Sequence, residues 1–417
     1  MLDTGATAWM LTSASLVLLM TPALALFYGG MSRNKSVLNM MMMVFGALAV
    51  VAVIYPLWGW SMTYGGQPIA GILANPFEQF GLMGTFDGAA VDDFGVPAWV
   101  GVAFQSTFAI ITVALIAGSL AERVKFGTWM LFATLWVTLA YFPMAHMVWG
   151  GGLLSGDGPI AALTGTAPID FAGGTVVHIN AGMAALVIAL VIGTRRQFGK
   201  EQVRPHSLPL IMLGSGLLFF GWFGFNAGSA FTADGLAGMA WVNTTTATGA
   251  AMLGWMLYEQ ITEKHATSLG AASGVVAGLV AVTPAAGALN PVGAIVLGLV
   301  AGFACAAAVS LKYRFGFDDS LDVVGVHLVG GLVGTVAIGF LATEGGLLFG
   351  GWFALLITQV LIALAALVFS GVVTFAVAKL LQKTVGWRVS DKDELLGIDL
   401  TQHAETAYEP QVLAGNY

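Results

Sequence analysis

The segment Asp170-Phe-Ala-Gly-Gly-Thr-Val-Val-His178 begins a long apolar stretch, and seven residues separate its aspartate from its histidine. The segment Asp319-Ser-Leu-Asp-Val-Val-Gly-Val-His327 repeats this spacing in the second half of the chain, again at the start of an apolar stretch. A glycine follows each histidine four residues later, at Gly182 and Gly331. Each segment opens the fifth apolar stretch of its half of the chain. The pattern therefore predicts an internal duplication.

The composition is typical of an integral membrane protein. Of the 417 residues, 58% are hydrophobic and only 9% are charged, whereas about 25% are charged in a typical soluble domain. The apolar residues come in blocks of about 20, long enough for a helix to cross ~30 Å of hydrocarbon. The 56 glycines indicate close packing, since small residues let membrane helices approach one another. A soluble globular protein is therefore not expected.

The apolar runs between polar breaks predict an all-α protein with eleven transmembrane helices. The shortest run is rich in glycine and alanine and lies at 268–284. The predicted spans are 8–30, 39–63, 98–120, 127–149, 173–193, 208–230, 236–258, 268–284, 288–311, 321–342 and 348–380.

The charged residues divide between the two sides of these spans. All 15 basic residues fall in one set of loops, and the opposite loops carry acidic residues instead. Because Lys and Arg stay preferentially in the cytoplasm, this division predicts an odd number of spans, with the N-terminus outside and the C-terminus inside. The start, Met1-Leu-Asp3, lacks the basic region of a signal peptide, so a cleavable leader is not expected.

This orientation places Asp170 on the outer side and Asp319 on the inner side. The halves 8–193 and 208–342 then run in opposite directions, as in the inverted repeats of transporters, whose sites lie near the midplane. A weaker echo pairs Phe27-Tyr-Gly-Gly30 with Phe225-Asn-Ala-Gly228. The predicted organisation is a transmembrane domain at 1–380, closed by the helix 348–380, and a cytoplasmic tail at 381–417. Composition alone favours a disordered tail.

Two histidines are predicted to line the site. His178 and His327 lie inside apolar spans, where ionisable side chains are costly and usually mark a functional path. The repeat would bring them together near mid-depth, and two facing imidazoles can share one hydrogen bond. The alternative is that they are satisfied core histidines on separate interfaces. Asp170 and Asp319 are expected to cap their helices, and Asp170 could also favour a cation near the entrance.

Aromatic residues supply the other half of the predicted site. Phe104 and Phe108 lie one turn apart on one helix face, Trp149 ends a span at the outer side, and Phe225 precedes Ser229 by four residues. Aromatic faces attract cations, and Ser229 could accept a hydrogen bond from one. The alternative for each aromatic residue alone is anchoring at the membrane interface. Neither a metal site nor a cofactor is predicted, and the lone Cys305 rules out an intrachain disulfide.

These segments resemble the ammonium transporter, methylammonium permease and Rhesus family, and in particular its bacterial ammonium transporter branch. The resemblance covers essentially the whole chain. It rests on Ala25-Leu-Phe-Tyr-Gly-Gly30, Phe104-Gln-Ser-Thr-Phe108, Ala121-Glu-Arg-Val-Lys125, Asp170-Phe-Ala-Gly-Gly174, Gly224-Phe-Asn-Ala-Gly-Ser229, Asp322-Val-Val-Gly-Val-His327 and His403-Ala-Glu-Thr-Ala-Tyr408.

The resemblance implies a homotrimer in the cytoplasmic (inner) membrane, with one pore for ammonium or ammonia in each subunit and methylammonium as an analogue. It implies roles for Trp149, Phe108 and Ser229 in an outer recruitment site that also involves Phe104. It further implies Phe108 and Phe225 as a gate, and His178 and His327 as the pore lining, with Asp170 in support. A PII-type signalling protein at the cytoplasmic face is an implied partner, whereas nucleic acid is not.

One position departs from the family pattern, because the tail has His403-Ala-Glu405 where the family usually has a central glycine. A tail packed on neighbouring subunits is still expected, but a glycine-specific turn is not. Three rival functions remain at this point: a Rhesus-type neutral ammonia channel, an ammonium sensor that signals through its tail, and a membrane metalloenzyme. We expect a transporter and not an enzyme, because the two histidines lack the i, i+4 spacing of a helical metal site and no third ligand is evident.

Overall fold

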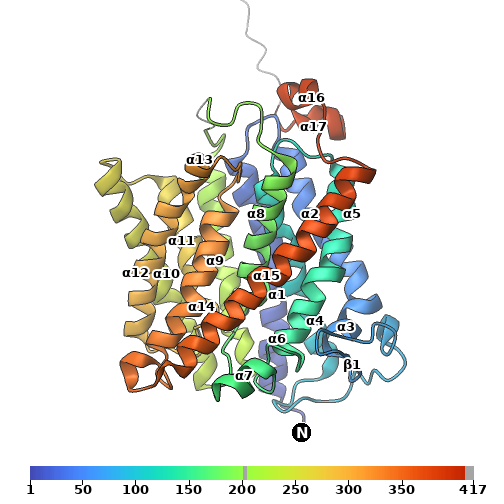
Figure 1. Cartoon of the computed structure of the whole chain (residues 1–417), viewed down its shortest axis with the longest axis vertical. Coiled ribbons are helices and arrows are strands. Elements are labelled where there is room, and N and C mark those ends of the chain that lie inside the picture. Colours follow the sequence, from blue (N-terminus) through green and yellow to red (C-terminus); the bar gives the residue numbers. More distant parts are fainter. Residues whose placement is uncertain (201–203, 409–417) are drawn as a thin grey trace, which may run out of the picture.

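The computed structural model describes residues 1–200 and 204–408, and these residues are predominantly helical. Long helices lie side by side along one direction, while α15 crosses them obliquely (Figure 1). The first half of the chain contains α1 (Thr4–Met31), α2 (Val37–Ile54), η1 (Tyr55–Gly59), α3 (Trp60–Tyr64), β1 (Pro68–Ile69), β2 (Leu73–Ala74), η2 (Phe80–Leu82), α4 (Ala98–Ile116), η3 (Ala117–Leu120), α5 (Phe126–Trp136), η4 (Val137–Tyr141), α6 (Phe142–Trp149), α7 (Pro159–Thr164), η5 (Gly174–Ile179) and α8 (Asn180–Ile192).

The described residues of the second half form helices. Its elements are α9 (Leu208–Asn226), η6 (Gly228–Ala230), α10 (Gly235–Thr262), α11 (Ser268–Val282), α12 (Pro291–Val309), α13 (Leu311–Phe315), η7 (Val324–Leu328), α14 (Val329–Leu341), η8 (Leu347–Phe349), α15 (Phe353–Thr384), α16 (Asp391–Leu396) and α17 (Ile398–His403).

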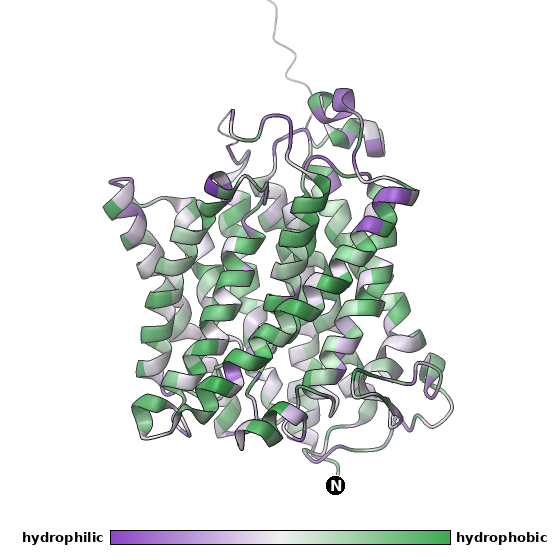
Figure 2. Cartoon of the chain, in the orientation of Figure 1, coloured by the Kyte–Doolittle hydropathy of each residue, from purple (hydrophilic) through white to green (hydrophobic). Residues whose placement is uncertain are grey.

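All eleven predicted spans contain a helix, and nine helices of the described residues are long and apolar enough to cross a membrane. The other two are α10 and α11. The 28-residue α10 is less apolar because it carries several threonines together with Asn243 and Glu259, and α11 has only 15 residues. Both helices pack against α12. The apolar middle of the bundle separates two more polar ends (Figure 2), as expected of a membrane protein.

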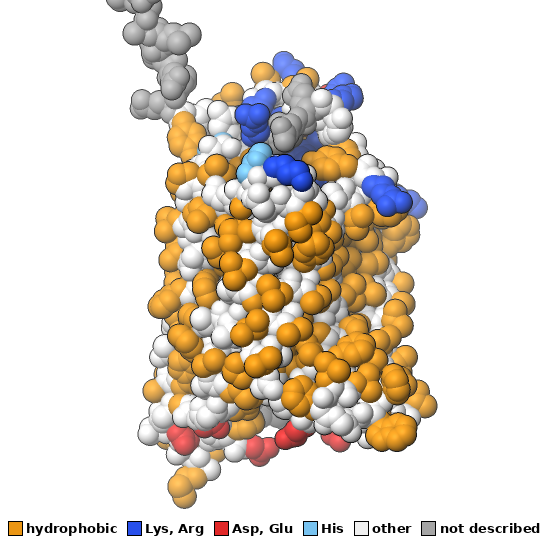
Figure 3. All heavy atoms as spheres, turned by 90° about the vertical axis from the view of Figure 1, so that its left-hand side faces the viewer, with side chains coloured by type: hydrophobic (Ala, Val, Ile, Leu, Met, Phe, Trp, Pro, Cys, Tyr) orange, Lys and Arg blue, Asp and Glu red, His pale blue; other side chains and the backbone are white. Residues whose placement is uncertain are grey.

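The two ends of the bundle differ in charge. On the face drawn in Figure 3, Lys and Arg side chains gather at one end and Asp and Glu side chains at the other. We call the first the basic end and the second, where the N-terminus lies, the acidic end. The basic end carries α16 and α17 (Figure 1).

The described part of the tail forms the short helices α16 and α17, against the expectation of disorder from composition alone. The Asp399 carboxylate accepts hydrogen bonds from the backbone N–H groups of Leu38 and Asn39, at 3.0 and 2.7 Å. It therefore satisfies two of the free N–H groups at the start of α2. Ala404 ends α17 with a φ of 56°, so the left-handed turn is made without glycine.

The two Asp-x7-His segments fold alike. Each histidine lies in a π-helical turn, η5 or η7, and each turn continues into a helix of 13 residues, α8 or α14. The π-helical turns that open the two helical segments begin at Gly174 and Val324, slightly later than the predicted span starts at 173 and 321. The reason is that the residues after each aspartate form a capped loop, in which Gly173 has a φ of 119°.

The glycines that follow the histidines let the two segments cross. A Cβ added to Gly182 would lie 2.5 Å from the backbone nitrogen of Leu328, and one added to Gly331 would lie 3.0 Å from the Cβ of His178. Each glycine therefore faces the histidine turn of the other segment. This reciprocal contact is what brings His178 and His327 together.

Candidate transport site

Asp170 is the anchor of the site at the acidic end. Its carboxylate accepts hydrogen bonds from the backbone N–H groups of Gly173, Gly174, Thr175 and Val176, at 2.5 to 3.2 Å, and one from the Thr175 hydroxyl. A carboxylate at the start of a helix satisfies free N–H groups and favours the positive end of the helix dipole. The capping expected for Asp170 is therefore present.

Gln359 of α15 holds the residue that precedes this anchor. Its side-chain oxygen accepts from the N–H of Ile169 at 2.9 Å, and its amide donates to the carbonyl groups of Ile169 and Thr335 at 2.8 and 3.1 Å. Gln359 is completely buried. The last long helix thus fixes the loop that carries Asp170.

Trp149 and Ser229 lie at the acidic end of the site and are partly buried. The Trp149 indole donates to the carbonyl oxygen of Asp170 at 2.9 Å, which fixes the ring beside the anchor. The Ser229 hydroxyl donates to the carbonyl oxygen of Phe225 at 2.8 Å. Because that bond uses the only hydroxyl proton, the lone pairs of Ser229 remain free to accept from a guest.

A stacked pair of phenylalanines closes the path beneath Trp149. The rings of Phe108 and Phe225 are parallel to within 20°, with centroids 4.1 Å apart, and Trp149 meets Phe108 edge to face at 6.0 Å. Phe104 is completely buried and packs on Phe108 at 4.8 Å. The structure therefore brings these four predicted aromatic residues together, with Phe104 supporting the pair.

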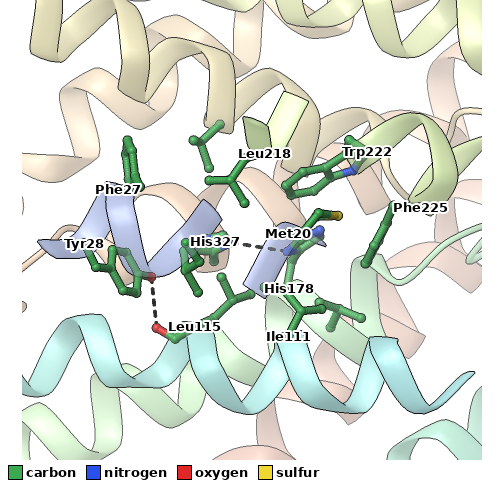
Figure 4. Close-up of a pocket in the computed structure, with 13 residues that line it drawn as sticks. Met20, Phe27, Tyr28, Ile111, Leu115, His178, Leu218, Trp222, Phe225 and His327 are labelled. Atoms are coloured by element: carbon green, nitrogen blue, oxygen red, sulfur yellow. Dashed lines mark hydrogen bonds between the residues drawn. The ribbon is translucent and has the colours of Figure 1, made fainter. Parts of the chain in front are cut away.

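His178 and His327 face each other below the phenylalanine pair. Their Nδ1 atoms are 3.2 Å apart and their rings are nearly parallel, at 21°. Figure 4 shows this hydrogen bond between side chains from two separate segments. Among the described residues, Nε2 of His178 has no hydrogen-bond partner. The prediction that the two histidines come together is correct, and the pair presents a polar edge to an otherwise apolar space.

That space is narrow. A cavity of about 10 Å³ runs past the two histidines and is lined mainly by apolar side chains, which is room for about one water molecule. Its lining also includes residues that the sequence analysis did not assign to the site: Met20, Leu24, Phe27, Tyr28, Ile111, Leu115, Val177, Leu218, Trp222 and Val276.

Trp222 is the most informative of these missed residues. Its ring stacks on His178 at 5.6 Å and 16°, and its indole donates to Thr283 at 2.8 Å. One signal was available, because Trp222 precedes Phe225 by three residues and so shares its helix face. Tyr28 lies toward the basic end and donates to the carbonyl oxygen of Leu115 at 3.0 Å.

Comparison with known proteins agrees with this arrangement. The model of the Ammonium Transporter Family matches residues 8–408. The chain belongs to the ammonium transporter family. An ammonium transporter of Mycobacterium tuberculosis (strain ATCC 25618 / H37Rv) is 51% identical over 99% of this chain and 92% of its own length.

Solved structures of ammonium transporter relatives share the fold. The crystal structure of Candida albicans Mep2 has a TM-score of 0.85 and 32% identity, and covers 98% of this chain and 91% of its own. A structure described as a sensor Amt protein has a TM-score of 0.87 and 25% identity, and covers 96% of this chain and 98% of its own.

The basic end of this ammonium transporter family member carries a buried charge network. Arg195 donates to the Asp318 carboxylate at 2.8 and 2.9 Å and to Glu122 at 3.2 Å. Beside Arg123 and Arg195, the pKa of Asp318 is lowered although burial opposes this. Burial raises the pKa of the neighbouring Asp319 to about 7, while Lys312 acts in the opposite direction.

Proposed function

We propose that this protein recruits ammonium at the acidic end, removes its proton there and conducts ammonia past His178 and His327. The observation that carries the proposal is the order in which the polar and aromatic groups follow one another from the acidic end to the histidines. A hydroxyl acceptor and aromatic faces (Ser229, Trp149) lead to a closed aromatic pair and then to a narrow apolar cavity with one polar edge.

The physical argument rests on the cost of moving a charge into that cavity. A bare ammonium ion there would lose its hydration shell, and unpaired burial of a charge is prohibitive. Cation–π contact is worth about 0.5–2 kcal/mol, which offsets only part of this cost at the mouth. Neutral ammonia avoids most of it. Sodium and potassium ions have no proton to give up, so the same mechanism is selective against them.

We further propose that the histidine pair relays the proton separately, which makes net transport electrogenic. The Nδ1 atoms are 3.2 Å apart, within reach of one shared proton. This contact offers a direct path by which a proton on one ring can pass to the other.

The proposal includes the arrangement in the membrane. All 15 basic residues lie on one side of the spans, which supports eleven crossings with the acidic end outside and the basic end in the cytoplasm. The alike folding of η5–α8 and η7–α14 supports an inverted repeat of about 8–193 and 208–342, closed by α15. We propose a homotrimer in the inner membrane, with its tail packed on neighbouring subunits and open to a PII-type protein.

The decisive experiment measures methylammonium uptake and current together in proteoliposomes. Wild-type protein is expected to take up methylammonium, with saturation at low concentration and an inward current. His178→Ala should retain recruitment but lose the current. Uptake without any current in wild-type protein would contradict the proton relay. Absence of saturation would favour a neutral ammonia channel of the Rhesus type.

An ammonium sensor is the second candidate, because one structural relative is described as a sensor Amt protein. A sensor would bind ammonium at the same aromatic groups and act through the tail. The discriminating test is growth on limiting ammonium in a host without its own transporters. Rescue of growth supports transport, whereas binding without rescue supports sensing.

A further inference from the structure

A second cavity lies at the basic end, in line with the histidine cavity. Its volume is about 200 Å³. Three segments line both cavities. In each segment, the residue that lines the second cavity lies nearer the basic end than the residue that lines the histidine cavity. The pairs are Tyr28 and Met31 on α1, Val276 and Leu269 on α11, and His327 and Asp322 in the segment that opens α14. The second cavity therefore occupies the inner mouth of the proposed route.

The ammonium group of Lys312 is held at the wall of this cavity. Its Nζ donates to the carbonyl oxygen of Asp319 at 3.0 Å and to the carboxylate of Asp322. It also lies 5.5 Å from the centroid of the Tyr313 ring. The side chain is only 9% exposed, so these contacts replace most of the water that would otherwise solvate the charge.

These three groups are the partners that a small primary ammonium ion requires. A carboxylate supplies charge, a carbonyl oxygen accepts a second N–H, and an aromatic face attracts the cation. Asp322 adopts a φ of 64°, a left-handed conformation that is uncommon for residues other than glycine. An irregular backbone at a cation contact is typical of sites that are held by their surroundings.

We propose that Asp322, the Asp319 carbonyl group and the Tyr313 ring form a primary-ammonium site that Lys312 fills with its own tethered ammonium group. A tethered group competes at a high effective concentration. Free ammonium from the cytoplasm therefore does not bind at the inner mouth of the native protein. Removal of Lys312 opens the site to ammonium or to a short alkylammonium ion.

The other buried cation of this cavity does not serve the same purpose. The guanidinium group of Arg195 is engaged by both Asp318 and Glu122, and its planar donors suit paired carboxylates. Lys312 in contrast ends in a compact group on a flexible stem, which ammonium can imitate. Arg314 on the same short helix is a matched control, since it is exposed and its guanidinium lies over the Phe315 ring.

The test is chemical rescue of Lys312→Ala in the full-length purified protein. The truncation removes three carbons and the nitrogen, so n-propylammonium chloride is the probe and choline chloride, which has no N–H donor, is the salt control. We expect n-propylammonium to raise the thermal midpoint of Lys312→Ala in a saturable way. The concentration for half of this rise should be at least tenfold lower than that of any effect on wild-type protein. Arg314→Ala should behave like wild type, and Lys312→Ala with Asp322→Asn should lose the rise.

A folded Lys312→Ala protein that responds no more than Arg314→Ala overturns the proposal. If the alanine variant does not fold, Lys312→Met keeps most of the stem, and ammonium chloride becomes the probe against sodium chloride. A saturable ammonium-specific rise in that variant supports the site, and its absence overturns it.

This inference rests on the proposed function only in placing the Lys312 site at the inner mouth of the route. A separate measurement distinguishes failure of the site from failure of the transport proposal. In oriented proteoliposomes, internal ammonium should inhibit methylammonium uptake at a concentration at least tenfold lower in Lys312→Met than in wild type. No uptake in wild type would contradict the transport proposal and leave the binding result standing. Uptake with unchanged inhibition, in a variant that binds the probe, would overturn the assignment to the inner mouth.

Discussion

Each end of the route has an aspartate ahead of a histidine turn, but the two ends differ in the groups that surround the carboxylate. At the acidic end the Asp170 carboxylate accepts four backbone N–H groups and a hydroxyl of its own segment. At the basic end the Asp319 carboxylate accepts two N–H groups, and Lys312 meets the nearby Asp322. The Asp170 carboxylate, held by dipoles alone, keeps a net negative charge that can act on a guest, whereas at the basic end the positive charge of Lys312 offsets that of Asp322.

The largest effect should come from breaking the acidic end. Asp170→Ala leaves four N–H groups without their acceptor, and each hydrogen bond to a charged group is worth about 1.5–3 kcal/mol. We expect methylammonium uptake to fall at least ~100-fold, which corresponds to about 2.7 kcal/mol in a rate. Asp319→Ala removes only a two-bond cap, worth about 0.5–2 kcal/mol, and should reduce uptake less than tenfold. Equal losses in the two variants would contradict the comparison.

The crossing of the two histidine turns gives the next largest effect. A Cβ at Gly182 would meet the backbone of Leu328 at 2.5 Å, whereas one at Gly331 would meet side-chain Cβ of His178 at 3.0 Å. Overpacking of this kind costs about 1–3 kcal/mol. Gly182→Ala should therefore lower the thermal midpoint more than Gly331→Ala. Gly249→Ala is a suitable control, since nothing lies within 4 Å of its added Cβ, and it should leave the midpoint unchanged or raised.

These contrasts show how far the sequence alone could lead. The Asp-x7-His spacing was sufficient to pair His178 with His327, because a repeated pattern relates positions without any knowledge of helix faces. Phe108 and Phe225 followed from the family resemblance. Trp222 was missed because an apolar stretch surrounds it, and Tyr28 stood in a quoted segment without being assigned to the site. The π turns at η1, η4, η5 and η7 also interrupt the regular period of 3.6 residues, so the face that each helix turns inward could not be extrapolated.

The contacts of Lys312 and Gln359 were missed for a different reason. Lys312 reaches across a loop to Asp322, and Gln359 reaches from α15 to Ile169, far away in sequence. No local pattern encodes such a contact. From the sequence, Asp322 stood only at the start of the segment Asp322-Val-Val-Gly-Val-His327, and Lys312 was one of the 15 basic residues assigned to one side. The charge division therefore predicted which end these residues occupy but not what they contact.

The titration of Asp319 provides a smaller and more selective test of the basic end. Its pKa is raised to about 7, chiefly by burial, with Lys312 and Asp322 as the charged groups that face it. A carboxyl group with a raised pKa in the folded state favours folding when it is protonated. Its contribution is full below the unfolded pKa of about 3.9 and is lost as pH rises toward 7. Relative to Asp319→Asn, the wild-type thermal midpoint should therefore fall between pH 4 and pH 7 and change little above.

The control for this titration is Asp322→Asn, measured in the same buffers. This variant removes one negative neighbour, so the pKa of Asp319 should decrease and the pH-dependent loss should move to lower pH. A difference between wild type and Asp319→Asn that does not vary with pH would contradict the assignment. Both variants leave the Asp170 anchor untouched, so the comparison between the two ends is preserved.

The smallest effect concerns the tail that covers the basic end. Ala404 has a φ of 56°, a conformation that costs a residue with a Cβ about 1–2 kcal/mol and glycine almost nothing. Ala404→Gly also loosens the unfolded chain, which offsets up to about 1 kcal/mol of this gain. We expect slower hydrogen exchange across 391–404 by a few-fold, with uptake unchanged. Because Asp399 caps α2 from this same short segment, slower exchange should extend to the first turn of α2. Protection confined to α17 would mean that the tail and the basic end open independently.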